Sequence, residues 1–286
     1  MGKGVPAAAR ALAILDFLAA HPTDSFSLSE LAKELGIGSG SAHALLGAMT
    51  QAGYLVRHPS HKTFRLGPSA IAVGHAALES HPVIEVARDE MRRIADELDL
   101  ECLAAAPLGD ELVMVARVGG SHAGRTLSRV GDRLPLIPPL GTMYVAWAGD
   151  DVVAAWLSRG DASEPPERIT GYLRALESAR ALGYSVGVVV GDTVTAVQPV
   201  SGDPKRLDLD PDLTYEIAYV AASVFDPRQE VALVINLDGF TQPLDLGSIV
   251  AIGQRLLDAA RVITRGIHGR LPEGLVPRRS PAVDKV

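Results

Sequence analysis

The feature that most constrains the fold is a pair of short amphipathic helices, joined by a tight turn, that the sequence predicts in residues 27–53. Ser27 and Glu30 have the S-x-x-E spacing of a capping box, so the first helix is expected to begin there. Gly36 is expected to end it, and a second run of apolar residues at positions i, i+3, i+4 and i+7 closes at Gly53. Two helices joined by a glycine-bearing turn form the helix-turn-helix pattern.

The segments around this pair complete a small domain. Residues 9–20 repeat apolar residues at helical spacing, which predicts a preceding helix. Two short strands are predicted at 54–58 and 63–66, around a turn that contains proline. A hairpin behind the second helix of the pattern is a wing. Residues 69–80 return to a helical pattern and are expected to link this domain to the next.

Beyond residue 100 the pattern changes to β-rich segments with helical stretches between and after them. Strands are predicted at 102–108 and 112–118, and again at 216–225 and 231–237, each pair around a polar turn. An antiparallel sheet covered by helices is the economical arrangement, so the predicted fold class is α+β. The expected organisation is a winged domain over 8–68, a linker helix over 69–82, a larger domain over 83–268 and a flexible tail over 269–286.

The charge is unevenly distributed. The net charge is −7, but residues 1–78 carry six Lys and Arg against four Asp and Glu, a net charge of +2, so the remainder carries −9. This excludes indiscriminate binding to nucleic acid and is compatible with DNA contact through the first part alone. Cys102 is the only cysteine, which excludes an internal disulfide and a cysteine-based zinc site. Because no apolar run reaches the roughly 18 residues of a membrane span and no secretion signal is present, a cytoplasmic protein is expected.

The second helix of the pair has no lysine or arginine in the stretch 37–53. The face opposite its apolar side presents small residues, and its short polar side chains can bond to bases or phosphates. Gly47 should cost about 1 kcal/mol relative to alanine, which a smooth surface for close approach to DNA would offset. The alternative is a poor helix former that is simply tolerated. The predicted DNA contacts on this helix are Ser39, Gly40, Ser41, His43, Ala44 and Gln51.

Positive charge is supplied by the hairpin that follows. A wing lies along the DNA backbone or enters a minor groove, so basic residues in it are expected to hold the phosphates. The alternative is a solvated surface cluster. His58 and His61 form an H-x-x-H pair, but a turn with no third ligand does not predict a metal site. The predicted contacts in the hairpin are Arg57, His58, Lys62 and Arg65.

The chain resembles the IclR family of bacterial transcriptional regulators from about residue 10 to about residue 268. The resemblance rests on the order and spacing of "RALAILDFLAAHP", "SLSELAKELGI", "SAHALLGAMTQAGYLVR", "FRLGPSAIAVG", "VGDRLPLIPPLG", "ARALGYSV" and "AYVAASVFDPRQEVALVINLDGF". It implies a winged helix-turn-helix joined by a linker helix to a GAF-like effector domain. It also implies a homodimer or homotetramer that binds double-stranded operator DNA and a small-molecule effector, with no cofactor.

Several positions depart from the family pattern. Gly38 and Ser39 replace a proline and a basic residue, and Ala44 replaces an arginine. Both changes remove charge from the helix that should enter the groove. In the larger domain, Tyr219 replaces a cysteine that many members carry, and serines of the last strand are replaced by Asn236 and Asp238.

By this resemblance, a loop and helix start together with two strands are expected to line the effector pocket. Met143 would form an apolar wall, Tyr219 would offer a hydroxyl, and free N–H groups at the helix start could receive a carboxylate. An acidic Asp238 favours a cationic or hydroxyl-bearing effector. Plain core packing for Met143 and Tyr219, and turn chemistry for Asp238, are the alternatives. The predicted effector-binding residues are Gly141, Thr142, Met143, Tyr219, Asn236 and Asp238.

The sequence also bears on two other function classes, an enzyme and a protein-interaction module. The sequence has no G-x-S-x-G, Walker A or H-E-x-x-H motif, so no catalytic residue is assigned and an enzyme is not expected. A protein-interaction module could use the uncharged helix face, but it would have no need of the basic hairpin.

Overall fold

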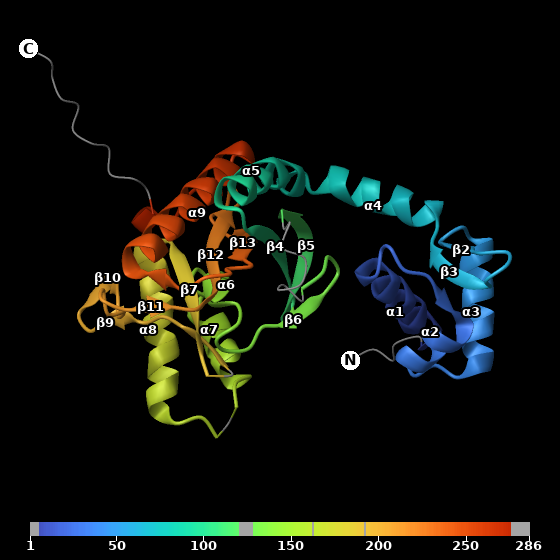
Figure 1. Ribbon diagram of the computed structural model, residues 1–286, viewed down its shortest axis with the longest axis horizontal. Coiled ribbons are helices and arrows are strands. Elements are labelled where there is room, and N and C mark those ends of the chain that lie inside the picture. Colours follow the sequence, from blue (N-terminus) through green and yellow to red (C-terminus); the bar gives the residue numbers. More distant parts are fainter. Residues whose placement is uncertain (1–5, 120–127, 162, 192, 276–286) are drawn as a thin grey trace, which may run out of the picture. The chain divides into compact units, whose positions relative to one another are not determined.

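The structure, a computed structural model (Figure 1), describes residues 6–119, 128–161, 163–191 and 193–275. These residues divide into two compact units between Pro82 and Val83, and Arg129–Asp132 group with the first unit. Each unit has a hydrophobic core of its own, as separate domains do.

The first unit combines helices with a small antiparallel sheet of order β1-β3-β2. Its elements are α1 (Pro6–Ala20), β1 (Phe26–Ser27), α2 (Leu28–Glu34), α3 (Ser39–Gln51), β2 (Leu55–Arg57), β3 (Thr63–Leu66) and α4 (Pro68–Ser80). The predicted capping box is confirmed: Glu30 N–H donates to Ser27 Oγ at 3.3 Å, and Ser27 N–H donates to Glu30 Oε2 at 2.7 Å. The helix-turn-helix and its wing are confirmed.

The core of the first unit lies where the first three helices meet one face of this sheet. Ile14 and Leu18 of α1 pack with Leu31 of α2, Leu46 of α3 and Phe64 of β3, and all five side chains are buried. The apolar periodicity that predicts these helices therefore marks the surfaces that hold them together.

The start of α4 is held against the end of α3. Ser69 N–H donates to Gly53 O at 3.1 Å, and Ser69 Oγ donates to Ala52 O at 2.9 Å. A Cβ on Gly67 would lie 2.3 Å from Gly53 O, so this approach requires glycine at position 67. Beyond this junction, α4 has no buried residue.

The second unit is built on a seven-stranded antiparallel sheet of order β6-β5-β4-β13-β12-β7-β8. Its strands are β4 (Glu101–Leu108), β5 (Glu111–Gly119), β6 (Arg133–Pro135), β7 (Tyr184–Val190), β8 (Thr193–Ala196), β12 (Ile217–Phe225) and β13 (Val231–Asp238). Outside this sheet lie β9 (Pro199–Val200), β10 (Asp203–Leu207), β11 (Thr214–Tyr215) and β14 (Leu244–Asp245). The helices are α5 (Pro82–Leu98), α6 (Thr142–Val145), α7 (Asp150–Ser158), α8 (Pro166–Leu182), α9 (Leu246–Gly266) and a 3-10 turn, Glu273–Leu275.

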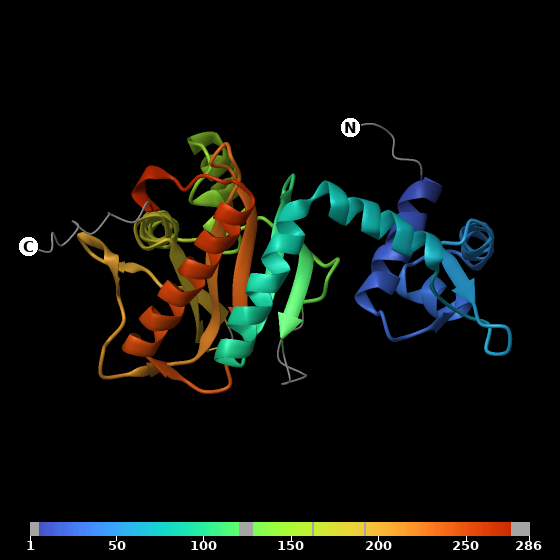
Figure 2. The ribbon, with the colours of Figure 1, turned by 90° about the horizontal axis from the view of Figure 1, so that it is seen from above.

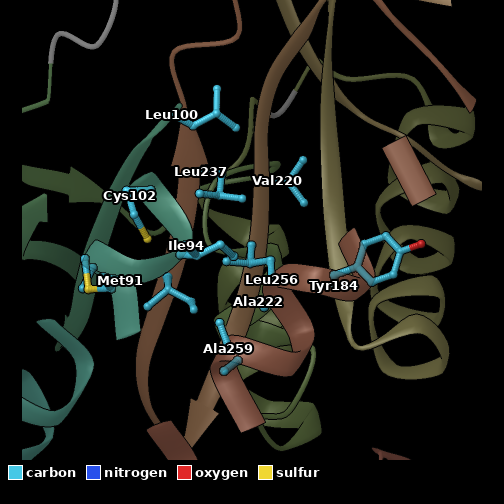
Figure 3. Close-up of a cluster of buried hydrophobic side chains, with 14 of the residues drawn as sticks. Met91, Ile94, Leu100, Cys102, Tyr184, Val220, Ala222, Leu237, Leu256 and Ala259 are labelled. Atoms are coloured by element: carbon cyan, nitrogen blue, oxygen red, sulfur yellow. The ribbon is translucent and has the colours of Figure 1, made fainter. Parts of the chain in front are cut away.

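Helices cover both faces of this sheet. Helices α5 and α9 lie along one face (Figures 1 and 2), where Met91 and Leu256 pack with Cys102 of β4 and Val220 of β12 (Figure 3). Burial raises the pKa of the Cys102 thiol. Helices α6, α7 and α8 pack on the opposite face through a second cluster that includes Trp156. The predicted α+β class is confirmed, and among the helices of the described ranges none is long and apolar enough to cross a membrane.

The predicted flexible tail over 269–286 is wrong for its first residues. Gly269 N–H donates to Thr264 O at 2.7 Å, and Leu275 is buried. A Cβ on Gly183 would lie 2.7 Å from the Leu275 side chain, which shows how closely this segment packs on the end of α8. Residues 276–286 lie outside the described residues.

Candidate DNA interface and effector site

Helix α3 buries the face that the sequence predicts and exposes the opposite one. Ala42, Leu46 and Met49 are buried, and Leu45 is half-buried. The exposed residues at spacings of three and four form one uncharged stripe, Gly40, Ala44, Gly47 and Gln51. The other predicted contacts on the helix, Ser39, Ser41 and His43, are exposed as well.

The N-terminus of α3 is open. Gly38 is its N-cap and makes no side-chain hydrogen bond to the first turn, which contains no acidic residue. The first N–H groups of a helix have no intrahelical partner, and they carry partial positive charge. This end of α3 therefore suits a phosphate oxygen.

Packing inside the first unit does not require glycine on the exposed stripe. A Cβ on Gly40 or on Gly47 would meet nothing within 4 Å. Gly47 lies inside the helix, where glycine is less favourable than alanine by about 1 kcal/mol. The absence of side chains at these two positions therefore brings no packing benefit inside the first unit, but it lets an external partner approach the helix backbone closely.

The hairpin loop between β2 and β3 is held by its own backbone and by one imidazole ring. Lys62 N–H donates to His58 O at 3.0 Å, and His58 Nδ1 accepts the N–H groups of Ser60 and His61 at 3.3 and 3.2 Å. The rings of His58 and His61 have centroids 4.6 Å apart. Lys62 has a φ of 54°, in the left-handed region. His58 therefore stabilises the turn that presents Lys62.

The two arginines of the hairpin lie on opposite faces of its sheet. Arg57 pairs with Phe64 across the strands, and its Cζ lies 5.6 Å from the centroid of that ring. Arg65 pairs with Val56 on the other face, beside a groove that Ile71 also lines. All four predicted hairpin contacts are exposed, and Arg57, His58 and Arg65 border one common hollow although the two arginines alternate along their strands.

The polar effector candidates lie on the sheet face that α6, α7 and α8 cover. Asn236 and Asp238 occupy alternate positions of β13 on the same face, and both are half-buried. One row of cross-strand partners consists of Arg117, Leu103, Asn236, Ala221 and Ser185. The adjacent row contains Gly119, Glu101 and Asp238.

Two carboxylates and one arginine of the described residues lie close together on this face. Burial and the neighbouring Glu101 carboxylate raise the pKa of Asp238 to about 7, although Arg117 acts in the opposite direction. Arg117 Nη2 donates to Glu101 Oε1, and its Nη1 donates to Ser128 O at 3.4 Å. Within the part of the chain that the structure describes, Glu101 Oε2 and Asp238 Oδ1 are buried without a hydrogen-bond partner. A buried acceptor without a donor is costly, so both oxygens are suited to an added donor.

Tyr219 lies against the backbone of the neighbouring strand. A Cβ on Gly187 would lie 2.2 Å from Tyr219 Cε1, so glycine at position 187 makes room for the ring. Burial raises the pKa of Tyr219, and its hydrogen bond with Ser185 acts in the opposite direction. The hydroxyl of Tyr219 is therefore already engaged inside the protein.

The start of α6 does not provide the free N–H group that the sequence predicts at Thr142. Thr142 N–H and Oγ1–H both donate to Pro139 O, at 3.4 and 2.6 Å. Gly141 has a φ of 82° and forms the turn. Met143 is buried, and its carbonyl accepts a hydrogen bond from Ser223 Oγ at 2.7 Å. A tight turn before the helix engages the Thr142 donor, so the expectation is wrong for Thr142, and for Gly141 it stays a prediction.

Glu101, Arg117 and Ser185 lie on the same sheet face as Asn236 and Asp238, here called the effector face, and were not among the predicted site residues. Glu101 immediately precedes the predicted strand 102–108, and its alternation with Leu103 is the signal that could have placed it on that face. Within the described ranges, no group of three His, Cys, Asp or Glu side chains is arranged to hold a metal ion.

Two family models match the chain. The IclR helix-turn-helix domain matches residues 7–59, and the bacterial transcriptional regulator IclR C-terminal domain matches residues 75–188. Together the two matches span more than half of the chain.

Curated relatives and solved structures agree with these matches. The HTH-type transcriptional regulator XynR of Escherichia coli is 25% identical over 259 residues, covering 90% of this chain and 95% of XynR. The HTH-type transcriptional regulator KipR of Bacillus subtilis is 23% identical over 271 residues, covering 90% and 95%.

Among solved structures, an IclR transcriptional regulator from Alicyclobacillus acidocaldarius has a TM-score of 0.68 at 20% identity, covering 92% of this chain and 98% of that one. An IclR homologue from Microbacterium hydrocarbonoxydans complexed with 4-hydroxybenzoate has a TM-score of 0.66 at 18% identity, covering 92% and 99%. These likenesses show that the fold is shared. The chain belongs to the IclR family of bacterial transcriptional regulators, in which a helix-turn-helix domain is combined with a C-terminal effector-binding domain.

Proposed function

We propose that this regulator binds a two-fold symmetric operator as a homodimer or a pair of dimers, in the cytoplasm and without catalysing a reaction. DNA is contacted by α3 and the β2–β3 hairpin, and a small molecule bound on the face of Asn236 and Asp238 changes that contact. The observation that supports this most is an uncharged, exposed α3 beside an exposed hairpin that carries Arg57 and Lys62.

The β2–β3 hairpin and α3 have different roles in this proposal. The hairpin holds the phosphates through Arg57, Lys62 and Arg65, and the open N-terminus of α3 adds one more phosphate contact. Base reading then falls to short side chains such as Ser41 and to Gln51, which can pair with adenine at two points. With three hairpin cations per protomer on phosphates, a dimer should show a slope of log K against log salt of roughly −5.

Dimerisation is supported by the uncovered surface of α4. This helix is apolar, yet none of its residues is buried, and Ile71 and Val73 are 74% and 55% exposed. A helix that is apolar on several sides normally has a partner. A second copy supplies one and repeats α3 in the two-fold arrangement that a palindromic operator needs.

Effector control requires two arrangements of the dimer that bind the effector with different affinity. We place the change in the linker helix α4, because its start is bonded to the end of α3 through Ser69. A shift of α4 would change the separation of the two α3 helices and hence the fit to half-sites.

The test is DNase protection on the DNA upstream of the protein's own gene, with purified full-length protein across a salt series. A protected, two-fold symmetric site that weakens with salt is expected. Lys62→Asn and Arg57→Gln should each weaken protection, and Lys205→Gln, an exposed lysine of the second unit, should not. Protection unchanged in both hairpin variants would instead favour a protein-interaction module that uses the α3 face.

A further inference from the structure

The effector face contains more acceptors than donors. Glu101 is only 4% exposed, and its Oε2 has no hydrogen-bond partner among the described residues. Asp238 Oδ1 is likewise buried and has no such partner. The two residues are direct cross-strand partners, so both oxygens belong to one site. Asn236, two residues before Asp238 on the same face, is half-buried.

The charge of the site is also unbalanced. Among the described residues Arg117 forms an ion pair with Glu101 but not with Asp238, and its guanidinium is already engaged with Glu101 Oε1 and Ser128 O. When Asp238 is ionised, the cluster has a net charge of −1. Buried charge without a counter-charge is unfavourable, and a ligand that brings the missing charge gains the corresponding free energy on binding.

We propose that the effector carries a small organic ammonium group, which binds between Glu101 and Asp238 and donates to both free carboxylate oxygens. This inference rests on the effector-binding function proposed above. An ammonium group has three N–H donors, which match Glu101 Oε2, Asp238 Oδ1 and the side-chain oxygen of Asn236. Tyr219 of the neighbouring strand β12 is close enough to interact electrostatically with Asp238.

Arg117 distinguishes this proposal from an anionic effector. A carboxylate ligand would bind to the guanidinium of Arg117 and would be repelled by Glu101 and Asp238. Neutralising Arg117 should then abolish binding of a carboxylate but maintain or strengthen binding of an amine. The two ligand classes respond with opposite sign to the same substitution.

The experiment measures binding to the full-length protein by calorimetry at pH 8. The probes are three carbon skeletons, propyl, benzyl and cyclohexylmethyl, each as the primary amine, the alcohol and the carboxylate. At least one amine should bind more tightly than its alcohol and its carboxylate. Asp238→Asn and Glu101→Gln should each weaken that amine by about tenfold, the effect of one charge-assisted hydrogen bond. Arg117→Gln should not weaken it.

The matched control is Glu111→Gln, which removes a carboxylate that pairs with Arg133 on the exposed edge of the same sheet. It should leave amine binding unchanged. If Glu101→Gln fails to fold, the amine affinity of Asp238→Asn alone tests the proposal. The proposal is overturned if no amine binds more tightly than the alcohol and the carboxylate of the same skeleton. It is also overturned if Asp238→Asn leaves the affinity for the preferred amine unchanged.

Adding the same probes to the protein on its operator separates this inference from the proposed function. An amine that binds but never changes operator occupancy would contradict effector control at this face while leaving the ammonium site intact. A carboxylate or alcohol that releases DNA would retain effector control and contradict the ammonium site.

Discussion

Glu101 and Asp238 face each other directly across β4 and β13, and Arg117 forms an ion pair with only the first of them. The carboxylate of Asp238 therefore lies in a buried setting beside like charge. This arrangement makes the stability of the effector-free protein depend on whether Asp238 holds a proton.

Asp238→Asn should stabilise the effector-free protein at pH 8. The pKa of Asp238 is raised from 3.8 to about 7 by burial and by Glu101, so the folded state retains a proton that the unfolded state releases. Stability is therefore lost as pH rises from about 4 to about 7 and then stays level. Removing the carboxylate should gain on the order of 4 kcal/mol above pH 7 and almost nothing below pH 4.

Urea unfolding of the variant and the wild type at pH 4 and pH 8 measures this difference. Among the described residues, Glu101 and Arg117 act on the pKa of Asp238, and the Asp238 carboxylate in turn raises the pKa of Tyr219 and of Cys102. Glu101→Gln should lower the pKa of Asp238 and reduce the effect. A variant that is more stable by the same amount at both pH values would contradict the assignment.

Gly47→Ala should stabilise the first unit by about 1 kcal/mol, because alanine is the better helix former and its Cβ meets nothing within 4 Å. Operator affinity should nevertheless fall, since the methyl group stands between the α3 backbone and DNA. Thermal unfolding and gel-shift titration measure the two effects. Gly247→Ala, at an exposed position of α9, is the control that leaves operator affinity unchanged.

Lys62→Asn and Lys62→Gln should separate the charge of the hairpin from its backbone geometry. Both variants lose the charge, so each should reduce the salt slope of a dimer by about 2. Asparagine tolerates the left-handed φ of 54° well, so Lys62→Asn should be the more stable of the two. Equal stability together with an unchanged slope would mean that Lys62 neither strains the loop nor contacts phosphate.

Ile71→Glu should dissociate the proposed dimer, because it places a charge on the exposed apolar surface of α4. Sedimentation should show a monomer with weakened operator binding. Leu213→Glu makes the same change at a residue of the second unit that is 55% exposed, and it should leave the dimer intact. Dissociation by Leu213→Glu alone would move the interface to the second unit.

Local chemistry explains which parts of the fold the sequence predicts. Ser27 and Glu30 lie three residues apart in the chain, so their mutual hydrogen bonds follow from spacing alone. Asn236 and Asp238 share a face because strand alternation has a period of two.

Contacts between distant segments are not predictable in this way. Glu101 meets Asp238 only because β4 pairs with β13 in one register, and the ring of Tyr219 lies on Gly187 only because β12 pairs with β7. A slip of one residue in either pairing would turn these side chains to the other face. Leu275 is buried for a similar reason, because its place beside Gly183 depends on how the chain returns after α9.

The bonds of Ser69 to Gly53 and Ala52, with Gly67 pressed against the same backbone, have a mechanical consequence. They join the start of α4 to the end of α3, so the two helices should rotate together as one rigid body. A rotation of α4 should therefore be transmitted directly to the exposed face of α3. In the proposed dimer, a movement of α4 would change the distance between the two α3 helices without any deformation inside the first unit.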